Sequence, residues 1–145
     1  MSAEGGEPRW SPMAKLVRQV CSEGDPQLST TLPAGAYSSQ EYFDLETRAI
    51  LRAGWQCAGR EEQVAAPGSY QSVDVLGVPL VLTRDSDADM HVMSRTCRHR
   101  WMEVASGAGT AATLQCGYHK WCYALNGQLL QAPLMDGVRE FPTQD

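Results

Sequence analysis

The sequence predicts a mainly β protein in which two N-terminal helices lead into an antiparallel β sandwich or barrel-like body. Three observations indicate this fold class. From Trp55 onward, short segments rich in β-forming residues alternate with turn residues. The pairs Leu76-Gly77 and Asn126-Gly127 each stand between two such segments, where a hairpin turn is expected. Before Trp55, by contrast, apolar residues recur with the period of a helix.

The expected strands are short and closely spaced, which is typical of an all-β body. They lie near residues 55–58, 70–75, 78–83, 90–94, 112–115, 122–124 and 128–131. The acidic run 85–89 begins like a calcium-binding loop, but Met90 occupies the position of the loop's glycine and Thr96 that of its glutamate. We therefore expect a solvated hairpin turn between the third and fourth of these strands.

Two helices are expected before the strands. Ser11-Pro12 begins the first, whose apolar stripe consists of Met13, Leu16, Val17 and Val20. The second is expected over residues 38–53. Ser38 and Glu41 are spaced as a capping box at its start, and Gly54 ends it.

Composition and charge exclude several functions. The 145 residues are enough for one domain, and the net charge of −5 argues against a nucleic-acid-binding protein, which needs a basic face. The longest apolar run, residues 78–82, is far shorter than the roughly 20 residues of a membrane-spanning helix. The acidic, glycine-rich N-terminus does not resemble a secretory signal peptide. We therefore expect a cytoplasmic protein whose five cysteines are free thiols or metal ligands.

Two of the three histidines lie beside cysteines, and these pairs are the candidate metal ligands. Cys97 and His99 are separated by one residue, and Cys116 and His119 by two. The third histidine, His91, lies in an expected strand, where a structural role is the default interpretation.

Two thiolates and two imidazoles suit two kinds of metal centre. A single zinc ion binds all four side chains at one point, in tetrahedral geometry. In a 2Fe-2S cluster of mixed ligation, two cysteines bind one iron and two histidines bind the other. Two loops that each carry one cysteine and one histidine favour the cluster, because structural zinc sites more often pair like with like in sequence.

The residues around these pairs resemble the two cluster-binding loops of the Rieske family. The segments CRHR (97–100) and CGYHKWCY (116–123) are most similar to the loops CxHR and CPYHGWxY of Rieske oxygenase alpha subunits of the aromatic-ring-hydroxylating type. Gly117 stands where that family has proline, Lys120 where it has glycine, and Trp101 where glycine is common. The resemblance extends from about residue 32 to residue 133.

This resemblance implies a fold, a cofactor and a set of ligands. The fold is the Rieske iron-sulfur fold, an antiparallel β sandwich with a small cluster-binding subdomain, preceded here by N-terminal helices. The cofactor is a Rieske-type 2Fe-2S cluster, with Cys97, His99, Cys116 and His119 as its ligands. Residues 1–31 are then a leader with a short helix, and residues 32–145 are the Rieske domain with its N-terminal helix.

The same resemblance implies one-electron transfer without a catalytic residue on this chain. The family hydroxylates at a separate mononuclear iron held by two histidines and a carboxylate. Only His91 remains after the two cluster ligands, so we expect the catalytic iron domain to be absent. The expected partners are a reductase or ferredoxin and an oxygenase catalytic domain. The alternatives are a free-standing Rieske-type ferredoxin and a zinc-binding interaction module; the helical segment 38–53 favours the oxygenase.

Overall fold

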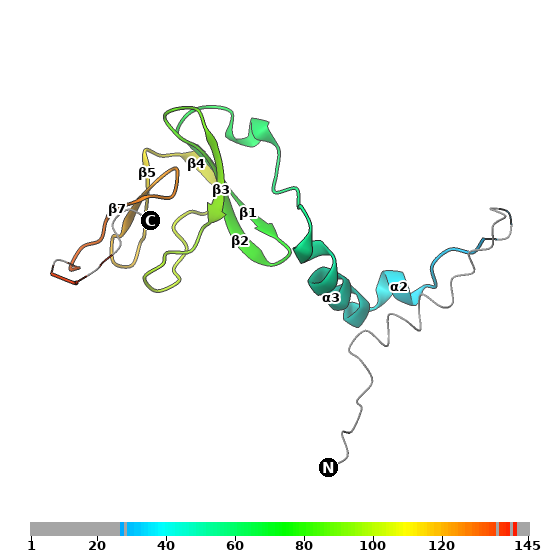
Figure 1. Cartoon of the computed structure of the whole chain (residues 1–145). Coiled ribbons are helices and arrows are strands. Elements are labelled where there is room, and N and C mark those ends of the chain that lie inside the picture. Colours follow the sequence, from blue (N-terminus) through cyan, green and yellow to red (C-terminus); the bar gives the residue numbers. More distant parts are fainter. Residues whose placement is uncertain (1–26, 28, 136, 140, 142–145) are drawn as a thin grey trace, which may run out of the picture. The chain divides into compact units, whose positions relative to one another are not determined.

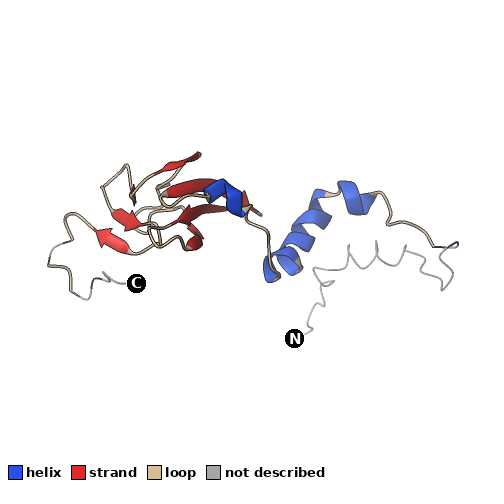
Figure 2. Ribbon diagram, turned by 90° about the horizontal axis from the view of Figure 1, so that it is seen from above, coloured by secondary structure: helices blue, strands red, loops and turns tan. Residues whose placement is uncertain are grey.

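A computed structural model describes residues 27, 29–135, 137–139 and 141, arranged in two compact units that divide between Gln56 and Cys57 (Figure 1). Helices make up the regular structure of the first unit, and the strands all belong to the second (Figure 2). The helix expected to begin at Ser11-Pro12 lies outside the described residues.

The first unit contains α2 (Gly35–Ser38), α3 (Gln40–Ala49) and the short 3-10 helix η2 (Leu51–Ala53). The single helix predicted over residues 38–53 is wrong: α3 ends at Ala49, and Gly54 caps only η2. The predicted capping box is wrong. The N-cap of α3 is Ser39, whose hydroxyl accepts a hydrogen bond from the Tyr42 N–H at 3.2 Å. Ser38 instead ends α2, and its hydroxyl donates to the Ala34 carbonyl. Either of the two adjacent serines has a hydroxyl that can cap a helix. Because α2 ends at Ser38, Ser39 is the residue with the extended backbone of an N-cap before α3.

The second unit begins with the 3-10 helix η3 (Glu61–Val64) and a four-stranded antiparallel sheet. Its strands are β1 (Ser69–Val75), β2 (Val78–Arg84), β3 (Met90–Ser94) and β4 (Ala108–Thr110), in the order β3-β2-β1-β4. Leu76 and Gly77 form the predicted turn between β1 and β2, both with positive φ, at 51° and 75°. Such a turn matches the twist of the strands that it joins.

Two differences from the expected strands have a common cause. Residues 55–58 form no strand, whereas β4 was not predicted. The segment of β4, Ala-Gly-Thr, has no alternation of apolar and polar residues, and it is a strand because Ser69 to Gln71 of β1 pair with it. A strand exists only beside a partner, and this partner is distant in sequence.

A smaller antiparallel sheet carries the rest of the second unit. It consists of β5 (Thr113–Gln115), β6 (Cys122–Ala124) and β7 (Leu129–Gln131), in that order. The Asn126-Gly127 turn joins β6 to β7 as predicted, with Gly127 at a φ of 91°. The two candidate ligand loops lie on either side of β4 and β5 in the chain, one before β4 and the other between β5 and β6.

The core of the second unit draws side chains from both sheets and from both loops. Its buried residues are Val81, Cys97, Ala105, Leu114, Cys116, Trp121, Tyr123 and Leu125. Thr83 of β2 is fully buried, and its hydroxyl donates a hydrogen bond of 2.5 Å to the Leu125 carbonyl after β6. This bond joins the larger sheet to the smaller one.

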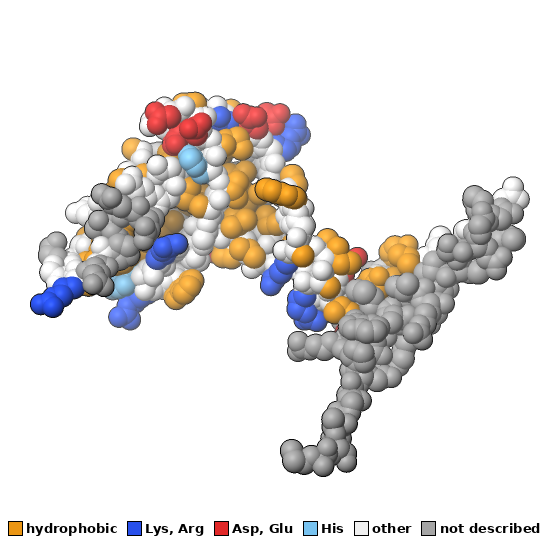
Figure 3. All heavy atoms as spheres, viewed as in Figure 1, with side chains coloured by type: hydrophobic (Ala, Val, Ile, Leu, Met, Phe, Trp, Pro, Cys, Tyr) orange, Lys and Arg blue, Asp and Glu red, His pale blue; other side chains and the backbone are white. Residues whose placement is uncertain are grey.

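The acidic run forms the turn of the β2–β3 hairpin, as predicted. The Asp85 carboxylate accepts hydrogen bonds from the backbone of Asp87 and Asp89, and it contacts His91 Nε2 of β3 at 2.8 Å. The bond to His91 lowers the pKa of Asp85, with smaller effects from the two backbone bonds. Acidic side chains gather at this end of the unit (Figure 3).

Among the described residues, the structure contains no helix with the length and apolar character needed to cross a membrane.

Replacing Thr83 tests the bond between the sheets. We expect Thr83→Val to lower the free energy of unfolding by about 1–3 kcal/mol, because it leaves the buried Leu125 carbonyl without a donor. Urea denaturation measures the change. Thr110→Val, which removes an exposed hydroxyl in β4, should stay within about 0.5 kcal/mol of the parent. Equal stability of the two variants would show that the bond does not support the fold.

Candidate metal centre

The two ligand loops have the same backbone hydrogen-bond frame. In the first, the Cys97 N–H donates to the Met102 carbonyl and the Trp101 N–H donates to the Cys97 carbonyl, at 2.7 and 3.0 Å. In the second, Cys116 N–H donates to the Trp121 carbonyl and Lys120 N–H to the Cys116 carbonyl, at 2.8 and 3.1 Å. Each loop is therefore a tight hairpin with its cysteine at the base and its histidine in the turn.

The closing residue of each hairpin has a left-handed backbone. Trp101 and Lys120, each four residues after the cysteine, have φ angles of 59° and 62°. These are the two positions at which the resembled family carries glycine, and a side chain there costs about 1–2 kcal/mol relative to an unstrained residue. The two departures from the family pattern therefore leave the loop path intact and add strain to it.

The two cysteines are buried and adjacent. Cys97 and Cys116 are 1% and 2% exposed. Burial raises the pKa of the Cys116 thiol, but the backbone N–H groups of Tyr118 and His119 and the side chain of Cys97 together bring the pKa below its ordinary value. The loop thus favours a thiolate at Cys116, which is the form that binds metals.

Tyr123 of β6 lies against the other thiol. Its hydroxyl is 3.2 Å from Cys97 Sγ, and it also accepts a hydrogen bond from the Arg98 N–H. Burial, together with the nearby Cys97 sulfur, raises the pKa of Tyr123. The hydroxyl therefore remains protonated at neutral pH, with its proton available to the sulfur.

The two histidines meet at the ends of the hairpins. The ring centroids of His99 and His119 are 4.6 Å apart. The His99 ring stacks on the indole of Trp121 at 4.9 Å and 5°, and Tyr118 lies against His119 at 3.8 Å. Burial, followed by the charges of His119 and Arg100, lowers the pKa of His99 and so favours its neutral form. Neutral imidazole is the form that binds a metal.

The structure thus places the two predicted sulfur ligands beside each other and the two predicted imidazole ligands beside each other. Among the described residues, no three His, Cys, Asp or Glu side chains are gathered to hold one metal ion. Nδ1 of His119 is buried without a hydrogen-bond partner in the described structure, as a nitrogen reserved for a metal would be. The donor set fits a centre of two irons, one bound by sulfur and the other by nitrogen.

His91 lies apart from this centre, in its hydrogen bond with Asp85. The four described cysteines, Cys57, Cys97, Cys116 and Cys122, are free thiols, as expected. The sequence assigns no role to Tyr123, the last residue of the segment CGYHKWCY. Its spacing from Cys116 was visible, but its contact with Cys97 crosses 26 residues of chain and appears only in the folded structure.

Lys120 allows the strain of the hairpins to be measured. We expect Lys120→Gly to be more stable than Lys120→Ala by about 1 kcal/mol, because both remove the long side chain and only alanine keeps the Cβ that is disfavoured at positive φ. Thermal or urea denaturation of the two variants gives the difference. An alanine variant as stable as the glycine variant would show that the loop relaxes away from this backbone conformation.

Comparison with known proteins places the second unit in a family. The model of the Rieske [2Fe-2S] domain family matches residues 54–142. The match includes both hairpins and both sheets, and it begins where the helices of the first unit end.

Curated relatives extend the similarity to most of the chain. The oxygenase subunit of carnitine monooxygenase from Acinetobacter baumannii is 31% identical over 136 residues, which are 93% of this chain and 36% of that protein. The chloroplastic choline monooxygenase of Arabidopsis thaliana is 29% identical over 131 residues, 90% of this chain and 31% of the relative. The chain therefore spans about a third of the length of these relatives.

Solved structures agree with these relatives. The quaternary ammonium Rieske monooxygenase CntA, crystallised with L-carnitine, superimposes with a TM-score of 0.75 at 31% identity, over 83% of this chain and 35% of CntA. Naphthalene 1,2-dioxygenase from Rhodococcus shares the fold, with a TM-score of 0.70 at 24% identity over 78% of this chain and 26% of that chain. The chain belongs to the Rieske 2Fe-2S domain family, whose cofactor is a Rieske-type cluster, and it is homologous to the Rieske domain of oxygenase alpha subunits.

Proposed function

We propose that this chain relays single electrons as the Rieske part of an oxygenase, whose catalytic iron is held by another domain or chain. The observation that carries this proposal is the division of four ligands between two equivalent hairpins, with sulfur buried and imidazole at the hairpin ends. The structure of CntA gives insights into inter-subunit electron transfer, which supports an electron-transfer role for the homologous domain of this chain. The partners proposed here are a reductase or ferredoxin as donor and an oxygenase catalytic domain as acceptor.

We further propose that Cys97 and Cys116 bind one iron of the cluster, and that His99 and His119 bind the other. The cluster, when bound, takes up and releases one electron at a potential of roughly −150 to +300 mV, because neutral imidazole replaces two thiolates. The protein supplies the thiolates from its core and the imidazoles from the hairpin ends. Tyr123 donates its hydroxyl proton toward Cys97 Sγ, which disperses negative charge on that sulfur.

The helical first unit favours an oxygenase part over a free-standing ferredoxin. The alignment with the carnitine monooxygenase subunit covers 93% of this chain and therefore reaches beyond residues 54–142.

We also propose a cytoplasmic location. The free thiols of the described cysteines support a reducing compartment.

Replacing one cysteine tests the ligand assignment. We expect the parent protein, reduced with dithionite, to give the electron paramagnetic resonance signal of a reduced 2Fe-2S cluster and to contain iron and sulfide in equal amounts. Cys116→Ser should lose the signal and most of the iron. Cys122→Ser is the matched control, because Cys122 is a free thiol on the neighbouring strand β6, and it should keep both. A signal that survives Cys116→Ser, or bound zinc without iron in the parent, would contradict the proposal.

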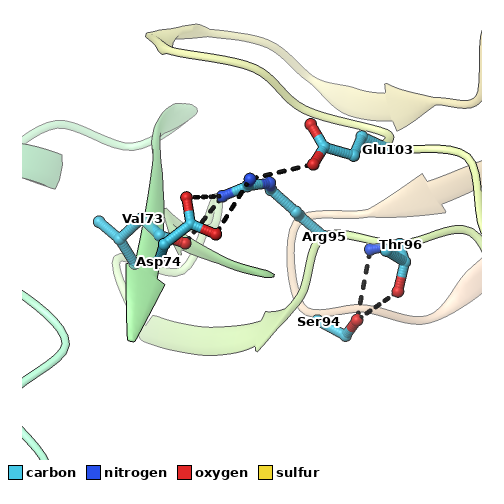
Figure 4. Close-up of polar contacts among 6 residues, drawn as sticks. All are labelled: Val73, Asp74, Ser94, Arg95, Thr96 and Glu103. Atoms are coloured by element: carbon cyan, nitrogen blue, oxygen red, sulfur yellow. Dashed lines mark hydrogen bonds and ion pairs between the residues drawn. The ribbon is translucent and has the colours of Figure 1, made fainter. Parts of the chain in front are cut away.

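One ion-pair cluster holds the first hairpin against the larger sheet. The Arg95 guanidinium contacts Asp74 at 3.1 Å and Glu103 at 3.0 Å, and it donates to the Val73 carbonyl at 2.8 Å (Figure 4). The Arg95 N–H also donates to the Pro79 carbonyl. Hydrogen bonds to Glu103, and then to Asp74, raise the pKa of Arg95.

Arg95 and Glu103 flank the first hairpin in sequence. The bridge between Thr96 and Glu103 and the bond from the Val104 N–H to the Arg95 carbonyl continue the hairpin ladder below Cys97. The Arg95 side chain is only 11% exposed. Its guanidinium is fixed by contacts with Asp74, Glu103 and the Val73 carbonyl. We infer that Arg95 positions the hairpin, and through it Cys97 and His99.

A second buried arginine provides the control for this role. Arg84 has the same 11% side-chain exposure, and it pairs with Glu61 and bonds two carbonyls at the acidic end of the unit. We expect Arg95→Lys and Arg84→Lys each to lower the free energy of unfolding by about 1–2 kcal/mol, because lysine lacks the planar fork. Only Arg95→Lys should change the cluster's resonance spectrum and shorten its lifetime in air. Identical spectra and lifetimes for both variants would assign Arg95 a role in stability alone.

A further inference from the structure

A cavity of about 740 Å³ is lined by the first ligand hairpin, strand β3 and the smaller sheet. Its walls come from segments that are distant in sequence and belong to the same unit. The turn between β6 and β7 packs against β3 here, because Met93 Sδ lies 3.1 Å from the position that a Cβ on Gly127 would take. Sites for small molecules usually have volumes of roughly 300–1,000 Å³. The cavity is therefore large enough for an organic ligand.

Aromatic side chains contribute much of the lining. Trp121 and Tyr123 belong to the core, and Phe141 contacts the Trp121 ring edge-on. Trp101 lines the cavity from the first hairpin and is 79% exposed. The apolar lining also includes Met93, Val104, Leu114 and Leu129. Such walls favour a flat aromatic ring, which stacks on aromatic side chains and gains from leaving water.

Trp101 has a backbone conformation that disfavours a side chain. Its φ of 59° is left-handed, and glycine is common at this position in the resembled family. The ring is mostly exposed, so its burial within the described structure offsets little of this strain. Strained residues concentrate at ligand sites, where binding uses the side chain that the strain holds in place. A glycine would leave this wall of the cavity without a side chain, so the wall is a departure from the family pattern.

The lining also contains a positive charge. Among the described residues that line the cavity, Arg98 is the only charged one, and none is Asp or Glu. Arg98 is exposed, and no ion pair joins it to another described residue, although its backbone N–H donates to the Tyr123 hydroxyl. A guanidinium binds a carboxylate through two parallel N–H bonds. The cavity thus favours an anion, in a chain whose net charge is −5.

We propose that this cavity binds a small planar aromatic carboxylate, with its ring against Trp101 and its carboxylate paired with Arg98. A neutral aromatic molecule leaves Arg98 unpaired, and an aliphatic acid does not stack on the indole. The ligand lies beside the candidate metal centre, because Tyr123 lines the cavity and its hydroxyl is 3.2 Å from Cys97 Sγ. Binding does not depend on the proposed electron transfer, so it is tested on the oxidised protein.

Three probes separate the effect of the charge from that of the ring. Equilibrium dialysis of the purified full chain measures the binding of 2-naphthoate, of 2-naphthamide, which has the same ring without the charge, and of cyclohexanecarboxylate, which has the charge without the aromatic ring. We expect one molecule of 2-naphthoate to bind per chain, about tenfold more tightly than either of the other probes. Equal affinities for 2-naphthoate and 2-naphthamide, or no saturable binding of 2-naphthoate, would overturn the proposal.

Two arginines of the same hairpin locate the charge. Arg98→Gln should weaken the binding of 2-naphthoate about fivefold or more and leave that of 2-naphthamide unchanged. Arg100→Gln removes the same charge from an exposed residue that does not line the cavity, and it should stay within about twofold of the parent. The measurements are made near physiological ionic strength, where charges farther apart than about 8 Å are largely screened. An equal loss in both variants would reject the cavity as the site.

Two tryptophans locate the ring. Glycine suits the positive φ of residue 101, so Trp101→Gly should fold at least as well as the parent. It should weaken the binding of 2-naphthoate about fivefold or more, because it removes one wall of the cavity. Trp55→Gly is the matched control, since Trp55 is fully exposed in the first unit, and it should stay within about twofold of the parent. Unchanged binding in Trp101→Gly would contradict the proposal.

Discussion

The second unit is organised around the burial of two thiols beside each other. Cys97 and Cys116 lie in the same core as Val81, Leu114 and Tyr123, so the packing of both sheets fixes their positions. A buried thiolate is costly unless hydrogen bonds or a metal stabilise it. Here the backbone of the second hairpin and the Tyr123 hydroxyl supply those contacts. The apolar core and the proposed metal centre therefore share Cys97 and Cys116, so that a change in the packing of one alters the other.

The two ligand hairpins have the same backbone hydrogen-bond pattern. Each has its cysteine at the base and closes through a left-handed residue, although the histidine comes two residues after the cysteine in one and three in the other. The two imidazoles nevertheless lie close together, with ring centroids 4.6 Å apart. Trp121 stacks on His99, and Phe141 contacts Trp121 edge-on, so His99 is held by aromatic packing.

Two arginines with little exposed side chain, Arg84 and Arg95, form ion pairs in different parts of the second unit. Arg84 and Arg95 have equal side-chain exposure and similar sets of partners, and each joins segments that are distant in sequence. One secures the β2–β3 hairpin against η3, and the other secures the base of the first ligand hairpin. The cations beyond Arg95, in the hairpins themselves, remain available to solvent.

The sequence by itself determined the β class, most strands and both hairpin turns. It also predicted Cys97, His99, Cys116 and His119 as metal ligands, and this assignment stays a prediction. It did so because turn residues and ligand spacings act over a few residues. The N-cap of α3 is Ser39 and not Ser38, which depends on the backbone turn between the two helices. Strand β4 was not predicted because it forms only by pairing with β1, which is distant in sequence. Only the tertiary structure decided that Tyr123 reaches Cys97 and that Arg95 reaches Asp74, across 26 and 21 residues. Contacts over such separations follow from how the sheets pack, which no local pattern in the chain records.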